Sequence, residues 1–100
     1  CHRGHRRAGA AMTPEQARPR SEVASFAEAM EERLRANDHK GHWRGCSMGY
    51  LRRRLADEVG ELRRALDKHA DAATILHEAA DVANFAMMIA DVARSEEPTS

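Results

Sequence analysis

Residues 47–94, which read SMGYLRRRLADEVGELRRALDKHADAATILHEAADVANFAMMIADVAR, decide the fold of this chain. Apolar residues recur here at the three- and four-residue spacing of α-helices, and a polar stretch at Lys68–Asp71 interrupts them. The pattern predicts a helix over about Ser47–Asp67 and another over about Ala72–Arg94, with Asp71 as the N-cap of the second. Two helices joined by so short a break fold back as an antiparallel hairpin.

A further helix is predicted over about Ser21–Ala36, with Ser21 as its N-cap and an apolar face. That face carries Val23, Phe26, Met30 and Leu34. The helix over 72–94 is apolar almost all round, which is typical of a helix buried on several sides. Two short neighbours cannot cover it, so we expect an all-α protein whose hairpin completes a four-helix-type bundle through oligomerisation.

The ends of the chain differ in composition from its middle. Residues 1–20 hold five arginines against one glutamate, and the whole chain has a formal net charge of zero, so the remainder carries a net charge of −4. We expect residues 1–20 to be a disordered basic extension, with Met12 as a natural start, residues 21–94 to be the one helical domain, and residues 95–100 to be a loose tail.

This composition excludes several classes of protein. An acidic helical body is unlike a nucleic-acid-binding domain, which needs a basic face on folded structure. No apolar run is long enough to span a membrane, the basic N-terminus lacks the apolar region of a secretory signal, and Cys1 and Cys46 make no disulfide framework. We therefore expect a cytoplasmic protein that binds neither nucleic acid nor membrane.

Four carboxylates interrupt the two apolar faces of the hairpin. Glu58 stands where Leu55 and Leu62 predict an apolar residue, and Glu61 follows on the adjoining flank. Glu78 and Asp81 share the face that carries Phe85 and Met88. In an antiparallel hairpin that turns near residues 69–70, Glu61 is level with Glu78 and Glu58 with Asp81. The sequence alone thus predicts four carboxylates at one height.

Such a cluster has two interpretations. Like charges brought together repel, and a hard divalent cation with oxygen ligands, Mg²⁺ or Mn²⁺, removes the conflict. Alternatively, the carboxylates are surface groups in salt bridges with arginines of the helix over 47–67. The candidate partners are Arg52, Arg54, Arg63 and Arg64. Two level pairs that both interrupt apolar stripes favour the metal interpretation.

The strings Glu58-Val59-Gly60-Glu61-Leu62 and Glu78-Ala79-Ala80-Asp81-Val82, with sixteen residues between Glu61 and Glu78, resemble the ExxE…ExxD signature of the MazG-like all-α NTP pyrophosphohydrolases. The resemblance covers about Phe26–Val92. It implies Mg²⁺ bound by Glu58, Glu61, Glu78 and Asp81, which form the catalytic centre, and a homodimer or homotetramer. It also implies hydrolysis of nucleoside triphosphates between the α and β phosphates, giving a nucleoside monophosphate and pyrophosphate.

Four other residues are candidate substrate-binding groups. In relatives the loop before the metal-binding helix contributes to the nucleotide pocket, which places Lys40, Trp43 and Arg44 there, although Trp43 could equally plug the end of the bundle. Asn84 could bind substrate or a metal-coordinated water, or bond a neighbouring helix. We do not expect zinc at His39, His42 and Cys46, because no second ligand pair accompanies them.

Two alternative functions remain open at this stage. One is a narrower relative that acts on phosphoribosyl-ATP or dUTP. The other is a helical dimerisation or nucleotide-sensing module that keeps the carboxylates and turns nothing over. Glu61 is a candidate for the general base.

Overall fold

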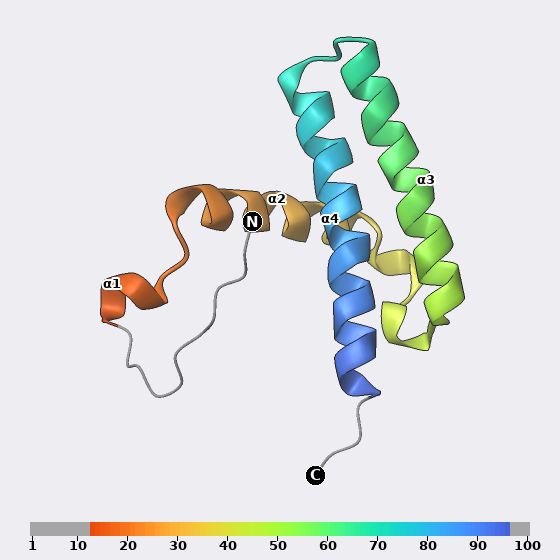
Figure 1. Cartoon of the computed structure of the whole chain (residues 1–100), viewed down its shortest axis with the longest axis horizontal. Coiled ribbons are helices and arrows are strands. Elements are labelled where there is room, and N and C mark those ends of the chain that lie inside the picture. Colours follow the sequence, from red (N-terminus) through yellow and green to blue (C-terminus); the bar gives the residue numbers. More distant parts are fainter. Residues whose placement is uncertain (1–12, 97–100) are drawn as a thin grey trace, which may run out of the picture.

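A computed structural model describes residues 13–96 of the chain, and all regular secondary structure within that range is helical (Figure 1). The all-α prediction is therefore confirmed for the described residues. Four α-helices and two 3₁₀ turns follow one another in this order: α1 Pro14–Ala17, α2 Ser21–Ala36, η1 Asp38–Lys40, η2 Trp43–Gly45, α3 Met48–Asp67 and α4 Ala72–Ser95.

Helices α3 and α4 form the predicted antiparallel hairpin and lie side by side along their lengths (Figure 1). Each begins at a side-chain cap: Ser47 Oγ accepts a hydrogen bond from the Tyr50 amide at 3.1 Å, and Asp71 Oδ1 accepts one from the Thr74 amide at 2.9 Å. Both caps satisfy backbone donors that a helix start leaves free. The Asp71 prediction is confirmed.

The turn between the two helices ends α3 in a Schellman motif. The His69 amide donates to the Leu66 carbonyl at 3.1 Å, and the Ala70 amide donates to the Ala65 carbonyl at 2.9 Å. These two bonds satisfy carbonyls that the helix end would otherwise leave free. The motif needs a left-handed residue, and His69 fills that place with φ 54°. A turn this tight brings the carboxylate-bearing stretches of α3 and α4 face to face.

Helix α2 crosses α4 near its middle, and its N-terminal half extends away from the hairpin (Figure 1). Its predicted bounds are correct, but the predicted N-cap is wrong. Arg20, not Ser21, is the N-cap: it is extended, and its carbonyl accepts the first helical hydrogen bond, from Ala24 at 3.0 Å. At the other end Asn37 Nδ2 donates to the Arg33 carbonyl at 2.9 Å.

The N-terminal stretch contains a helical turn that was not predicted, Pro14–Ala17. Thr13 and Gln16 form a reciprocal capping box, in which each amide donates to the other's side-chain oxygen at 2.9 Å and 3.1 Å. Pro14 occupies the first helical position, where its fixed φ is favourable. The rest of the predicted disordered extension, residues 1–12, lies outside the described residues, as do residues 97–100 of the predicted tail.

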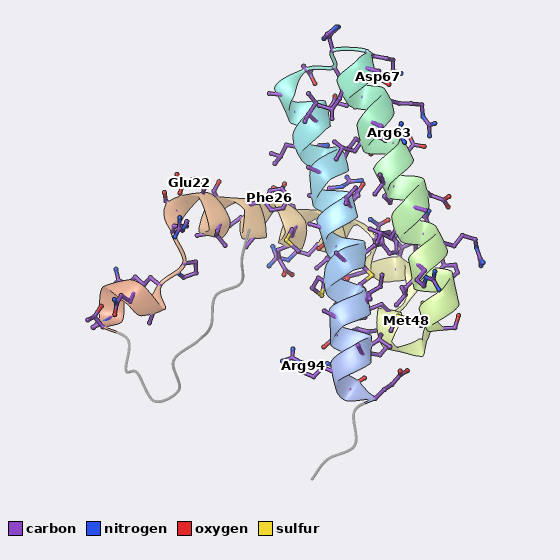
Figure 2. The ribbon with its side chains drawn as sticks, in the orientation of Figure 1. Glu22, Phe26, Met48, Arg63, Asp67 and Arg94 are labelled. Atoms are coloured by element: carbon purple, nitrogen blue, oxygen red, sulfur yellow. The ribbon has the colours of Figure 1, made fainter. Side chains whose placement is uncertain are left out.

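The apolar core of the described chain is small. Its buried apolar residues are Leu51, Ala65, Ala80 and Val92. All four belong to α3 and α4, and α2 buries no side chain completely. Figure 2 shows Glu22 and Phe26 on the α2 segment that projects from the hairpin. No helix within residues 13–96 combines the length and hydropathy that crossing a membrane requires.

Candidate metal centre and adjoining pocket

Three of the four predicted carboxylates meet between α3 and α4. Glu58, Glu78 and Asp81 each offer an oxygen, and these atoms all lie within 4.8 Å of one another. Among the residues the structure describes, this is the one group of three side chains whose ligand atoms lie close enough together to hold a metal ion. All three residues are partly buried. The hairpin thus sets Glu58 of α3 level with the Glu78–Asp81 pair of α4, as the sequence predicts.

Glu78 has the least favourable environment of the three. Its carboxylate has no hydrogen-bond or ion-pair partner among residues 13–96, whereas Glu58 and Asp81 each have one. Burial raises the pKa of Glu78, and the nearby charges of Asp81, Glu58 and Glu61 raise it further. An ionised carboxylate held against other carboxylates is a group that a cation would stabilise.

Glu61, the fourth predicted ligand, lies beside this cluster and not within it. Its carboxylate accepts a hydrogen bond from Arg64 Nη2 at 3.0 Å, and its side chain is 52% exposed. Because Glu61 still contributes to the raised pKa of Glu78, it is close enough for its charge to be felt at the cluster. The structure therefore assigns it an outer position on the solvent side of α3.

Arginines partner the other two carboxylates. Arg54 Nη2 donates to Glu58 Oε2 at 2.8 Å, and Arg33 donates to both oxygens of Asp81, at 3.0 Å from Nε and 3.2 Å from Nη2. The salt-bridge interpretation is thus correct for Glu58 and for Glu61, whose partners belong to their own helix. Arg33 was missed because its contact spans 48 residues; its one signal is that it follows Met30 by three residues on the apolar face of α2.

A pocket of about 600 Å³ adjoins the cluster. Glu58 and Asp81 line it together with Arg33 and Arg54, and its opposite wall comes from the loop before α3. Of the predicted substrate-binding residues, Lys40, Trp43 and Asn84 line this pocket. Phe85, Met88 and Tyr50 add apolar and aromatic surface. Carboxylates, cations and aromatic rings thus share one cavity of the size of a small-molecule site.

Asn84 presents an unsatisfied polar atom in the lining of this pocket. The residue is 3% exposed, and its Nδ2 donates to the Met30 carbonyl of α2 at 3.0 Å. Its Oδ1 is buried and has no hydrogen-bond partner in the described chain. Leaving such an atom unpaired costs about 1–3 kcal/mol, and the residue that carries it lines the pocket. Asn84 thus makes one of its two predicted contacts, the bond to a neighbouring helix.

Two of the predicted loop residues, Trp43 and Arg44, form hydrogen bonds with Asp91 of α4. The Trp43 indole N–H donates to Asp91 Oδ2 at 2.9 Å, and Arg44 donates to Asp91 at 3.0 Å from Nε and 3.3 Å from Nη2. These bonds lower the pKa of Asp91 to about 2, the bond from Arg44 more than the bond from Trp43. Arg44 was predicted to bind substrate together with Lys40 and Trp43. In the structure it does not line the pocket.

Trp43 has contacts on both sides of the loop. It lines the pocket, and its bond to Asp91 fixes the loop against α4. The His42 ring stacks on the indole with centroids 4.1 Å apart, which covers one of its two faces. Asp91 was not identified from the sequence, although a carboxylate on an apolar helix beside Val92, near the negative end of the helix dipole, is a signal that it needs cationic partners.

Comparison of the chain with the profiles of known families, with curated proteins and with solved structures gives no match in any of the three.

Proposed function

We propose that this chain is a Mg²⁺-dependent nucleoside triphosphate pyrophosphohydrolase that cleaves between the α and β phosphates to give a nucleoside monophosphate and pyrophosphate. The observation that carries the proposal is the cluster of Glu58, Glu78 and Asp81, whose oxygens lie within 4.8 Å of one another. Two of these residues also line the 600 Å³ pocket. The resemblance of these two segments to the MazG-like signature supplies the reaction.

The donor set fits a small hard cation. Mg²⁺ holds oxygen ligands at about 2.1 Å, so two oxygens on opposite sides of the ion lie about 4.2 Å apart. Only one of the three oxygen pairs can take that spacing, because ligands on adjacent corners lie about 3 Å apart, so the three oxygens, which here lie within 4.8 Å of one another, would close around the ion. Mn²⁺ accepts the same ligands. Glu78, which has no partner in the described chain, is the residue whose charge most needs the ion.

The pocket offers the groups that a nucleotide requires. Aromatic rings of Trp43 and Phe85 suit a base, and the buried Oδ1 of Asn84 accepts one N–H or O–H donor. Lys40 adds a cation to the wall formed by the loop. A triphosphate that reaches from the aromatic wall to the carboxylates would place its phosphorus atoms next to Glu58 and Asp81.

Within this proposal the carboxylates divide the chemistry between them. Glu58, Glu78 and Asp81 hold the cation, which supplies Lewis acidity to the phosphate oxygens and to the attacking water. Glu61 is the carboxylate least committed to the cluster, because its present partner is the exposed side chain of Arg64. A carboxylate beside the centre can accept the proton of that water, so we assign this role to Glu61.

We further propose that two copies of the chain assemble. The core holds only Leu51, Ala65, Ala80 and Val92, which is little apolar burial for a helical domain. Val23 of α2 is 54% exposed and Leu76 of α4 is 43% exposed. A second copy that packs on the projecting half of α2 would cover these side chains and complete the four-helix-type bundle.

One observation favours a non-catalytic alternative. Arg33 and Arg54 already neutralise Asp81 and Glu58, so the hairpin can hold two of its three clustered carboxylates without any ion. A nucleotide-sensing or dimerisation module with the same geometry would bind a nucleotide and release no product.

A panel of nucleotides tests these proposals together. Purified full-length chain is incubated with each common NTP and dNTP, including dUTP, and with phosphoribosyl-ATP, in Mg²⁺, and pyrophosphate release is measured. We expect release that EDTA abolishes and that Glu58→Gln and Asp81→Asn each abolish while helicity by circular dichroism is kept. Glu32→Gln, an exposed site on α2, is the matched control and keeps activity. Binding without release across the panel would replace the hydrolase by the sensing module.

A further inference from the structure

Two guanidinium groups face the acidic cluster from different helices. Arg33 comes from the last turn of α2 and Arg54 from α3, and both line the pocket. Each side chain is 31% exposed, whereas their carboxylate partners Asp81 and Glu58 are 19% and 14% exposed. These are therefore half-buried ion pairs at the pocket wall, and they differ from the freely solvated pairs elsewhere on the helices, such as Arg35–Glu31.

Arg54 is held in place by more than its carboxylate. Its guanidinium carbon lies 5.0 Å from the centre of the Phe85 ring, within the range of a cation–π contact. A second nitrogen donates to Asp57 at 3.0 Å. Arg33 forms the two parallel hydrogen bonds with Asp81 that a guanidinium forms best with a planar carboxylate or a phosphate. Both groups are thus positioned at the pocket before any ligand is present.

A cation and a guanidinium compete for the same carboxylate oxygens. The cluster and Asp57 carry four negative charges and the two arginines two positive ones, so a divalent ion added to this set brings it to neutrality and leaves no excess negative charge to hold the arginines away from an anionic ligand. Once an ion holds Glu58 and Asp81, the N–H groups of both arginines lose part of their acceptors while they still line the cavity. Asn84 lines the same pocket, and its buried Oδ1, which has no hydrogen-bond partner among residues 13–96, is an independent observation in favour of a ligand there.

We propose that Arg33 and Arg54 are polyphosphate-binding residues, held on Asp81 and Glu58 in the free protein and transferred to the phosphate oxygens of the substrate when a divalent cation takes those carboxylates. This inference rests on the proposed metal centre and adds to it the residues that bind the phosphates. Guanidinium groups bind phosphates through paired N–H donors, and the pocket brings two of them to one place. Cation and polyphosphate affinities are then coupled, each ligand strengthening the other.

The proposal predicts that the same substitutions change the affinity for Mn²⁺ and the affinity for triphosphate in opposite directions. Arg33→Gln and Arg54→Gln each remove a cation that competes for the carboxylates, so Mn²⁺ alone should bind about two- to fivefold more tightly, the range expected for one partly exposed charge pair. The same variants lose charge-assisted bonds to phosphate, so inorganic triphosphate in the presence of Mn²⁺ should bind about tenfold or more weakly. An arginine that serves only as a salt-bridge partner would leave the triphosphate affinity at its wild-type value.

The experiment is isothermal titration calorimetry on the full-length chain, first with Mn²⁺ and then with inorganic triphosphate at saturating Mn²⁺. Arg35→Gln and Arg53→Gln are the matched controls, because both side chains are exposed on the same two helices and neither lines the pocket. Arg33→Lys and Arg54→Lys keep the charge and lose the paired donors, so they should restore part of the triphosphate affinity. Circular dichroism verifies that each variant is folded.

Tighter Mn²⁺ binding together with weaker triphosphate binding, in both variants and in neither control, establishes the proposal. Mn²⁺ affinity that falls with triphosphate affinity, or triphosphate affinity that stays at the wild-type value, overturns it. Failure of the wild-type chain itself to bind Mn²⁺ overturns the metal centre and, with it, the proposed hydrolase. Wild-type chain that binds Mn²⁺ and hydrolyses nucleotides while the arginine variants behave like the controls overturns this inference alone.

Discussion

Asn84 Nδ2 lies 3.0 Å from the Met30 carbonyl oxygen, a bond that ties α4 to α2 one helical turn from the Arg33–Asp81 ion pair. The bond fixes the amide so that Oδ1, its other polar atom, is buried without a partner. We therefore expect Asn84 to add little to the stability of the fold, or to lower it, and to strengthen ligand binding.

Replacing Asn84 by its apolar isostere separates those two contributions. Asn84→Leu loses one neutral hydrogen bond, worth about 1 kcal/mol, and also removes a buried unsatisfied atom that costs about 1–3 kcal/mol. We expect the free energy of unfolding in urea to stay level or rise, while the KM for the best nucleotide increases. A loss of stability with an unchanged KM would show that Asn84 only links α4 to α2 and does not bind the nucleotide.

The carboxylate of Glu78 has no hydrogen-bond or ion-pair partner among residues 13–96, so we expect its replacement to stabilise the fold. Burial and the charges of Asp81 and Glu58 raise the pKa of Glu78, so its ionised form at neutral pH opposes folding. Glu78→Gln should raise the melting temperature in EDTA and abolish the further rise that wild-type chain gains from Mg²⁺. Differential scanning fluorimetry with and without Mg²⁺ measures both effects. Equal Mg²⁺-induced shifts in wild type and variant would place the ion elsewhere.

The link between the loop and α4 through Asp91 should be pH-dependent in a defined window. Its pKa is lowered in the folded protein from 3.8 to about 2, chiefly by the hydrogen bond from Arg44. A lowered pKa stabilises the fold above the unfolded value, and that stabilisation is lost as the pH falls through the folded value. The stability difference between wild type and Asp91→Asn should therefore be constant above about pH 5 and shrink between pH 4 and pH 2.

Urea titrations of both proteins at several pH values measure this difference, and the subtraction removes the contribution of the other titrating groups. A difference that is the same at pH 6 and at pH 2 would show that the Asp91 carboxylate is not what fixes the loop.

The parts of the fold that sequence predicts well are those that local physics determines. The bounds of α2, α3 and α4 follow from apolar periodicity, and Ser47, Asp71 and Asn37 mark ends by capping chemistry that acts within a few residues. Glu58 lies level with Asp81 because the two residues are equally far along the chain from the centre of a short turn. The missed turn α1 has a local signal too, the Thr13–Gln16 capping box, which lacks any apolar periodicity to accompany it.

What the sequence could not provide are contacts that depend on how helices cross. Arg33 reaches Asp81, and Arg44 reaches Asp91, only because α2 crosses α4 and the loop lies along its C-terminal half. No periodicity in α2 fixes that crossing. Glu61 illustrates the same limit: its spacing places it level with Glu78, but the rotation of α3 turns its carboxylate toward Arg64.

The projecting half of α2 predicts self-association. Phe26 and Leu76 border a shallow hollow between α2 and α4, and Val23 beside it is 54% exposed. Light scattering at micromolar concentration should report at least a dimer, and Leu76→Glu should lower that mass toward the monomer. Val59→Glu is the control, since Val59 is also exposed but belongs to α3, which makes no contact with α2. A monomeric wild-type chain would contradict the assembly.

Variants of Trp43 and Arg44 can separate the part of Trp43 that holds the loop on α4 from the part that lines the pocket. Trp43→Phe keeps a ring in the pocket and loses the indole N–H that donates to Asp91. Arg44→Gln removes the other bonds to Asp91 and leaves the pocket lining unchanged. Both should lower the melting temperature and leave nucleotide affinity near that of the wild type. Trp43→Ala alone removes the ring from the pocket.

If a base stacks on the indole face that His42 leaves free, Trp43→Ala should lose about 1–3 kcal/mol of binding, which is about 5- to 150-fold in affinity. KM rises alone if stacking binds substrate and transition state equally, and kcat falls as well if stacking positions the phosphates. Trp43 is the one tryptophan of the chain, so a non-hydrolysable nucleotide with Mg²⁺ should change the emission of the wild type directly. Unchanged emission at saturating nucleotide, with a normal KM in Trp43→Ala, would leave Trp43 as the residue that holds the loop on α4 and place the base elsewhere in the pocket.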